Sequence, residues 1–170
     1  MSSLDNAIKV LESDLKTSPM RIAAHSDMPF AIFRYSPLEE FNLRKHLRLL
    51  SITLKNECGR HVSFVSLSRL VWETVDLFGE EDLYNTEKLR GFNAAQRHIN
   101  QLLTSRDFKP AEDSVLEKIS GLNPARDMVF LVRAGGFAPG IYRTSILLDM
   151  LHNRTSVPSI LFFPGSAEAG

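Results

Sequence analysis

The sequence predicts an α/β fold with three layers, in which a short, mainly parallel sheet of four strands is flanked by helices. Four apolar segments of strand length are separated by segments with helical periodicity. This alternation favours parallel strands, because a chain that leaves one end of a strand must cross back before it can pair in parallel. Residues 80–122 carry only helical signals, which predicts a helical insertion between strands two and three.

Two helices are predicted in the first third of the chain. Apolar residues recur at helical spacing over residues 3–17. A longer helix is expected over residues 37–56, where Ser36 and Glu39 have the spacing of a Ser-x-x-Glu capping box. Gly59 follows its end, as is typical of helix termini.

The four strands are expected at residues 29–35, 61–68, 128–134 and 159–163. The first is a continuous apolar run, which is typical of a buried strand. The second is more polar and is therefore expected nearer a sheet edge. Ser68 is expected to cap the helix that follows it.

The length, charge and cysteine content of the chain limit the classes of protein to which it can belong. The chain has 170 residues, with 20 Lys and Arg balanced by 20 Asp and Glu, so no global charge attracts it to nucleic acid or to an anionic membrane. We expect a single α/β domain over residues 1–170, with the helical insertion at about 80–122. The lone Cys58, the polar N-terminus and the lack of an apolar run near ~20 residues predict a soluble, cytoplasmic protein without membrane contact.

A glycine-rich segment lies between the third strand and the next helix, in the layout of a phosphate-binding loop. Gly135, four residues and then Gly140 match the spacing of G-x-x-x-x-G-K-[ST]. However, Ile141 and Tyr142 occupy the positions of the lysine and the hydroxyl residue. Pro139 also removes a backbone donor that such a loop uses. The sequence therefore argues against hydrolysis of ATP or GTP.

The glycines and prolines that follow the third and fourth strands have an alternative to phosphate binding, which is a structural role in turns. These residues are Gly135, Gly136, Pro139, Gly140, Pro164 and Gly165. Glycine permits backbone angles that are closed to other residues, and proline has a fixed φ.

Arginines lie at or near the predicted strand ends. In an open parallel sheet, ligands bind beyond the carboxyl ends of the strands, where helix N-termini also gather. These side chains are therefore candidates to bind an anion or the carboxylate of a partner. The alternative is that each pairs with a local acid or projects into solvent. The candidates are Arg34, Arg69, Arg133 and Arg143.

No catalytic residue, metal site or cofactor is predicted. The five histidines occur singly, without an H-E-x-x-H motif or a cysteine pair. No G-x-S-x-G motif precedes a helix. The charged residues at the start of the 37–56 helix, including Glu40, Arg44 and Arg48, are interpreted as a solvated face with i,i+4 pairs.

The segments "DMVFLVRAGGFAPGIYRTSILLDML" and "VPSILFFPGS" resemble the BrxB family of bacteriophage exclusion (BREX) systems. The shared features are an apolar strand, a glycine, a proline, an arginine that opens a leucine-rich helix, and a strand that ends in Phe-aromatic-Pro-Gly. They fall at Gly135 or Gly136, Pro139, Arg143, Leu147, Leu148, Leu151, Val157, Pro158, Phe162, Phe163, Pro164 and Gly165. Family chains tend to continue past this end, so we expect the chain to be truncated at its C-terminus relative to the family.

The resemblance implies a small cytoplasmic component of an antiphage defence system that also contains a PglZ protein, an ATPase and a methyltransferase. It implies no catalytic activity. The leading hypothesis is a non-catalytic interaction or scaffold subunit that binds other BREX proteins, above all PglZ, with the BREX ATPase as a further partner. The alternative is a nucleotide- or anion-binding regulatory module with a degenerate phosphate loop. Direct binding of nucleic acid is not expected.

Overall fold

The computed structural model describes residues 3–22, 29–137 and 140–165. The chain divides into two compact units. Unit 1 comprises Met1–Phe64, Gly121–Val132 and Ser156–Gly170, and unit 2 comprises Val65–Ser120 and Arg133–Thr155. The segments of the two units therefore alternate along the sequence. That the whole chain forms a single domain stays a prediction.

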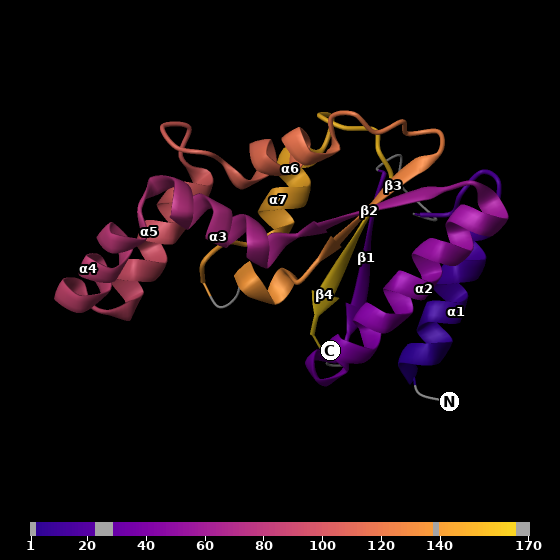
Figure 1. Ribbon diagram of the computed structural model, residues 1–170, viewed down its shortest axis with the longest axis horizontal. Coiled ribbons are helices and arrows are strands. Elements are labelled where there is room, and N and C mark those ends of the chain that lie inside the picture. The colour runs from indigo at the N-terminus through magenta and orange to yellow at the C-terminus, as the bar shows by residue number, and fades with distance from the viewer. Residues whose placement is uncertain (1–2, 23–28, 138–139, 166–170) are drawn as a thin grey trace. The chain divides into compact units, whose positions relative to one another are not determined.

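Helices separate the four strands along the chain (Figure 1). In chain order they are α1 (Ser3–Lys16), β1 (Phe30–Tyr35), the 3-10 helix η1 (Pro37–Glu39), α2 (Glu40–Cys58), β2 (His61–Ser66), α3 (Leu67–Phe78), α4 (Glu80–Arg90), α5 (Phe92–Thr104), α6 (Ala111–Ile119), β3 (Asp127–Val132), the 3-10 helix η2 (Ala134–Phe137), α7 (Thr144–Leu151) and β4 (Ser159–Pro164).

The strands form one four-stranded sheet in the order β1-β4-β3-β2. β4 pairs in parallel with both β1 and β3, so Ser159 lies opposite Phe30 on one side and Val129 on the other. Helices α4, α5 and α6 follow one another between β2 and β3. The α/β class, the parallel sheet and the helical insertion are thus confirmed.

The prediction that the first strand is buried was wrong. β1 lies at an edge of the sheet, only its terminal residues Phe30 and Tyr35 are buried, and Ile32 is exposed. The buried strand is β3, in which every residue from Asp127 to Leu131 is buried. β2 lies at the other edge, as its more polar sequence indicated.

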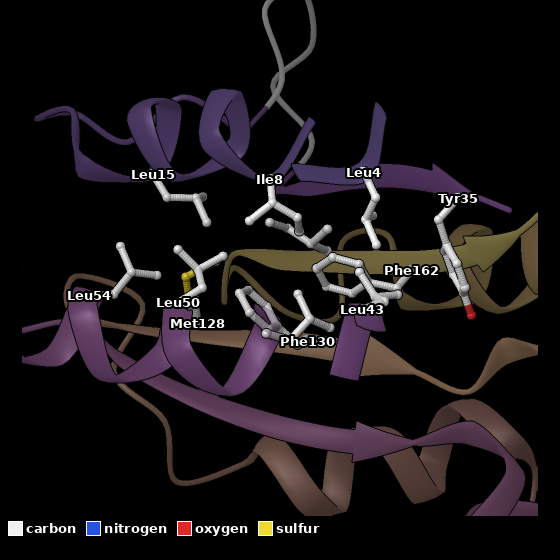
Figure 2. Packing of buried hydrophobic residues seen from close by; sticks show 12 residues of the cluster. Leu4, Ile8, Leu15, Tyr35, Leu43, Leu50, Leu54, Met128, Phe130 and Phe162 are labelled. Atoms are coloured by element: carbon white, nitrogen blue, oxygen red, sulfur yellow. The ribbon is translucent and has the colours of Figure 1, made fainter. Parts of the chain in front are cut away.

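Helices α1 and α2 cover one face of the sheet in unit 1 (Figure 2). Their leucines and isoleucine pack against aromatic rings from the two central strands, and the rings of Phe130 and Phe162 meet edge to face at 5.0 Å. Val129 and Leu131 alternate with Phe130 along β3 and are also buried, so both faces of this strand are covered. The helical members of this core are Leu4, Ile8, Leu15, Leu43, Leu47, Leu50 and Leu54.

The start of α2 differs from the predicted capping box. The Ser36 side chain makes no capping hydrogen bond, because η1 precedes the α-helix and moves its first residue to Glu40. The Glu40 carboxylate instead accepts hydrogen bonds from the Tyr35 hydroxyl and, at 2.9 Å, from Arg44 Nε. Burial and the Glu40 carboxylate raise the pKa of Tyr35, so its phenol remains a donor. This hydrogen-bonded group ties the end of β1 to the first turn of α2.

Ser66, and not Ser68, caps α3. Its Oγ accepts a hydrogen bond of 3.3 Å from the Arg69 amide, because β2 passes directly into the helix at this residue. Ser68 lies where η2 approaches α3 most closely in unit 2. A Cβ atom added to Gly136 would be 2.4 Å from Ser68 Cβ and 2.6 Å from Ser68 Cα. The absence of a side chain at Gly136 therefore allows the two elements to pack.

Helix α3 also packs on α5 in unit 2, and α6 packs on α7. Phe78 and Phe108 contact edge to face with ring centroids 4.9 Å apart, and Phe137 and Tyr142 do so at 5.1 Å. Unit 2 thus has its own apolar interior. Its fully buried leucines include Leu67, Leu70, Leu103 and Leu147.

Leu47→Ala should destabilise the protein far more than Leu49→Ala, although both leucines lie on α2. Leu47 is 2% exposed in the core and Leu49 is 63% exposed. We expect Leu47→Ala to lower the free energy of unfolding by about 2–5 kcal/mol, because it leaves a cavity. Leu49→Ala should stay within about 0.5 kcal/mol of the parent. Urea denaturation measures both, and equal losses would contradict this core.

Gly136→Ala should lower the free energy of unfolding by about 1–3 kcal/mol, because the new methyl group would overlap the backbone and side chain of Ser68. Gly121→Ala is the control, since a Cβ there meets no atom within 4 Å. If both variants melt at the same temperature, the close approach of η2 to α3 is wrong.

Candidate functional site

The four candidate arginines are all exposed. Arg34 lies on β1 in unit 1, whereas Arg69, Arg133 and Arg143 belong to unit 2. Their convergence on one rim of the sheet therefore stays a prediction.

The arginines differ in whether their guanidinium groups form ion pairs. Arg69 Nε forms an ion pair of 3.1 Å with Glu73, one helical turn along α3, which is the local pairing considered as the alternative. For Arg34, Arg133 and Arg143, no side-chain hydrogen bond or ion pair is found within residues 3–22, 29–137 and 140–165. Arg34, Arg133 and Arg143 therefore remain the candidates for binding an anion.

The segment that resembles a phosphate-binding loop uses its backbone amides internally. The Gly136 amide donates to the Arg133 carbonyl at 3.1 Å, and the amides of Ile141 and Tyr142 both donate to the Phe137 carbonyl, at 3.2 and 3.0 Å. A phosphate loop needs such amides to point at the anion. These three amides are unavailable for that purpose.

The turn residues of this segment serve different purposes. Gly140 has a positive φ of 89°, in the region that favours glycine, and Arg133 adopts a φ of 59° where the chain leaves β3. Gly136 is required by its approach to Ser68, and Gly135 is an exposed residue of η2. Pro139 lies outside the described residues.

Two contacts from distant parts of unit 2 hold the chain just before Arg143. Asn100 Nδ2 on α5 donates to the Ile141 carbonyl at 2.6 Å. The buried Tyr142 hydroxyl donates to Glu112 on α6 over a long 3.5 Å, and burial together with this carboxylate raises the pKa of Tyr142. The phenol therefore remains protonated. Sequence reasoning missed both contacts, since neither partner lies in a recognisable motif.

Arg143 borders an open cleft of about 470 Å³ in unit 2. It is the N-cap residue of α7 and the cation among the residues that line the cleft. A guanidinium beside amide and hydroxyl groups can hold an anion or a carboxylate, whereas none of the described residues that line this cleft has a carboxylate or imidazole to act as a general base. The lining residues are Asn100, Thr104, Gly140, Tyr142, Arg143 and Ile146.

A second open cleft of about 490 Å³ lies between α3 and α6. Lys118 Nζ pairs with Glu73 at 2.9 Å, and Lys109 Nζ pairs with Glu117 at 2.5 Å. These lysines lower the pKa of Glu73 and Glu117. Because the cations are already neutralised, this cleft offers less to an anion than the cleft at Arg143.

The turn after β4 closes the end of the sheet in unit 1. Pro164 lies opposite Tyr35, and the Gly165 amide donates to the Tyr35 carbonyl at 2.9 Å. A Cβ on Gly165 would lie 3.2 Å from the Phe163 ring. The Phe-Phe-Pro-Gly segment therefore lies beside the point where the chain leaves β1 for η1.

Among the described residues, no group of three or more His, Cys, Asp or Glu side chains is arranged to hold a metal ion. His46 contacts Asp5 at 3.0 Å, and Cys58 is half-buried with a free thiol. No helix in the described ranges is long and apolar enough to span a bilayer.

Comparison with known proteins assigns the family. The family model for the BREX protein BrxB matches residues 63–170. A curated BREX protein BrxB from Bacillus cereus (strain H3081.97) is 29% identical over 147 residues, which cover 83% of this chain and 72% of the relative. No solved structure matches. Because the family model spans more than half of the chain, the resemblance seen in the sequence is confirmed: the chain belongs to the BrxB family, whose members are components of bacteriophage exclusion systems.

Proposed function

We propose that this chain is a non-catalytic interaction subunit of its BREX system and that it binds the PglZ-like component. Membership of the BrxB family supports a role among other BREX proteins. The observation that carries the proposal is Trp72, the one tryptophan of the chain, which is 60% exposed on α3.

An exposed tryptophan is typical of a protein–protein interface. Tryptophan, tyrosine and arginine are enriched among the residues that contribute most to binding. The two aromatic residues bury a large area with few rotatable bonds. Trp72 lies one helical turn from both Arg69 and Asp76, so an aromatic ring and charges of both signs share the outward face of α3. Tyr84 and Phe92, on α4 and α5 of the same unit, are also exposed.

Trp72→Ala should abolish co-purification of this chain with the PglZ-like protein of the same system. The melting temperature should stay close to that of the parent, because the ring lies outside the core. Val10→Ala on α1, an apolar residue of similar exposure in unit 1, is the control and should retain binding. The BREX ATPase is the further partner to test in the same way. If the parent chain captures neither protein, the proposal is wrong.

The cleft at Arg143 favours a second candidate, an anion- or nucleotide-binding regulatory module. Its support is the exposed Arg143 guanidinium beside Asn100 and Thr104, which forms no ion pair with the part of the chain that the structure describes. The internally bonded amides of Gly136, Ile141 and Tyr142 count against a nucleotide bound by the loop itself.

Thermal shift with ATP, ADP, GTP and inorganic phosphate separates the two candidates. A ligand at about 100 times its dissociation constant would stabilise the fold by about 2.7 kcal/mol. The interaction proposal predicts no shift and no hydrolysis. A shift that disappears in Arg143→Ala and persists in Arg69→Ala would instead assign the cleft to an anion.

A further inference from the structure

Helix α2 carries a second apolar surface on the side that faces away from the core of unit 1. We define the outer stripe as Leu38, Phe41, Leu49 and Ile52, whose exposed fractions are 94, 73, 63 and 55%. Leu38 belongs to η1 and the others to α2. Isolated exposed apolar residues are normal in proteins, but several of them along one side of a helix indicate a surface that another molecule covers.

The outer stripe is narrow. At 3.6 residues per turn, Phe41, Leu49 and Ile52 fall within roughly 80° of the helix circumference. The buried leucines of α2 fall within roughly 60° on the opposite side, so the helix has two apolar faces half a turn apart. The outer stripe runs for roughly 21 Å along the helix axis. A stripe of this width and length matches the seam between two helices, whereas a helix that lies in a membrane buries a wider face.

The lysines and arginines of α2 between Phe41 and Asn56 have no acidic residue among them. Lys45 lies within the stripe, and Arg48 and Lys55 lie along one flank, as their helical positions require. Within the described ranges, no side-chain hydrogen bond or ion pair neutralises these three cations. The opposite flank carries the uncharged Asn42 and Thr53, and at its start Asn42 donates a hydrogen bond to the Glu39 carboxylate. The surface therefore has a basic side and a side without lysine or arginine.

Phe41 is held in place by the hydrogen-bonded group at the start of α2. The Arg44 guanidinium lies 5.2 Å from the centroid of the Phe41 ring, in the geometry of a cation–π contact. Arg44 is in turn bonded to Glu40, which accepts the hydrogen bond of the buried Tyr35 hydroxyl. An aromatic side chain that is ordered before binding loses little conformational entropy when a partner covers it.

We propose that the outer stripe binds an amphipathic helix of a partner protein, with apolar residues against Phe41, Leu49 and Ile52. Acidic residues of that helix would lie along the flank that faces Arg48 and Lys55, with a further acid opposite Lys45. Charge complementarity selects this partner, because an apolar seam with unpaired cations rejects a basic helix and accepts an acidic one. The inference rests on the proposed function only in that the partner is a protein.

The test uses the full chain and three probes. The first is a synthetic helical peptide of about 18 residues, with leucines along one stripe and glutamates along one flank, long enough to cover the stripe. The second has lysine in place of each glutamate. The third is a vesicle of phosphatidylcholine and phosphatidylserine. Fluorescence anisotropy should show binding of the acidic peptide alone, with an affinity that falls as salt is added.

Substitutions on the outer stripe should change this binding without changing the melting temperature. Phe41→Ala should weaken binding of the acidic peptide about 30-fold. The double variant Arg48→Glu/Lys55→Glu should weaken it about tenfold and should now bind the basic peptide. Lys88→Glu/Arg90→Glu on α4 reverses two other exposed cations and should leave both affinities unchanged.

Equal binding of the acidic and basic peptides would overturn the proposal, as would binding to vesicles alone or to no probe. If the acidic peptide alone binds, the natural partner is located with a photoreactive residue at position 45. The chain that carries it is co-expressed with the other BREX proteins of its system. We expect cross-links to a segment with apolar residues at helical spacing and acids on one flank. If these tests fail while Trp72 still controls co-purification, the proposed function stands and the outer stripe is not the docking surface.

Discussion

The arrangement of unit 1 depends on the position of β4 between β1 and β3. Both neighbours form their hydrogen bonds with this strand. The centroid of its Phe162 ring lies 5.3 Å from that of Phe33 and 5.0 Å from that of Phe130. Without β4, β1 would have no partner in the sheet. The leucines of α1 and α2 would also lose the Phe162 ring, against which they pack. The Phe-Phe-Pro-Gly end of β4 also fixes the exit of β1 through the Tyr35 carbonyl, which sets where α2 begins.

The class of fold, the first helix and the end of α2 could be predicted, because they follow from local periodicity and from Gly59, which has the left-handed φ expected at a helix end. The order of the strands could not. The continuous run of apolar residues in β1 suggested burial on both faces. Whether the strand lies at the edge or the centre of the sheet is decided by its pairing with β4, about 130 residues away. The caps also differed locally, since η1 displaced the start of α2 and β2 ended at Ser66.

The candidate site was predictable only in part. Arg143 could be named because it follows a strand and opens a helix. Its surroundings could not, because Asn100 and Glu112 reach Ile141 and Tyr142 from helices that no motif connects to the loop. The outer stripe was missed for another reason. Its four apolar residues are interleaved with Glu40, Arg44 and Arg48, whose i,i+4 spacing suggested a solvated face, so one helix carries two superimposed periodicities.

The alternation of the two units along the sequence has a consequence for synthesis on the ribosome. Every residue of unit 2 precedes Ser156, whereas unit 1 still requires β4. At about 5–20 residues per second, β1 and its two helices emerge roughly ten seconds before the strand that completes their sheet. Unit 2 is therefore complete first, and the apolar side chains of α1 and α2 are a surface that a chaperone would shield until β4 is synthesised.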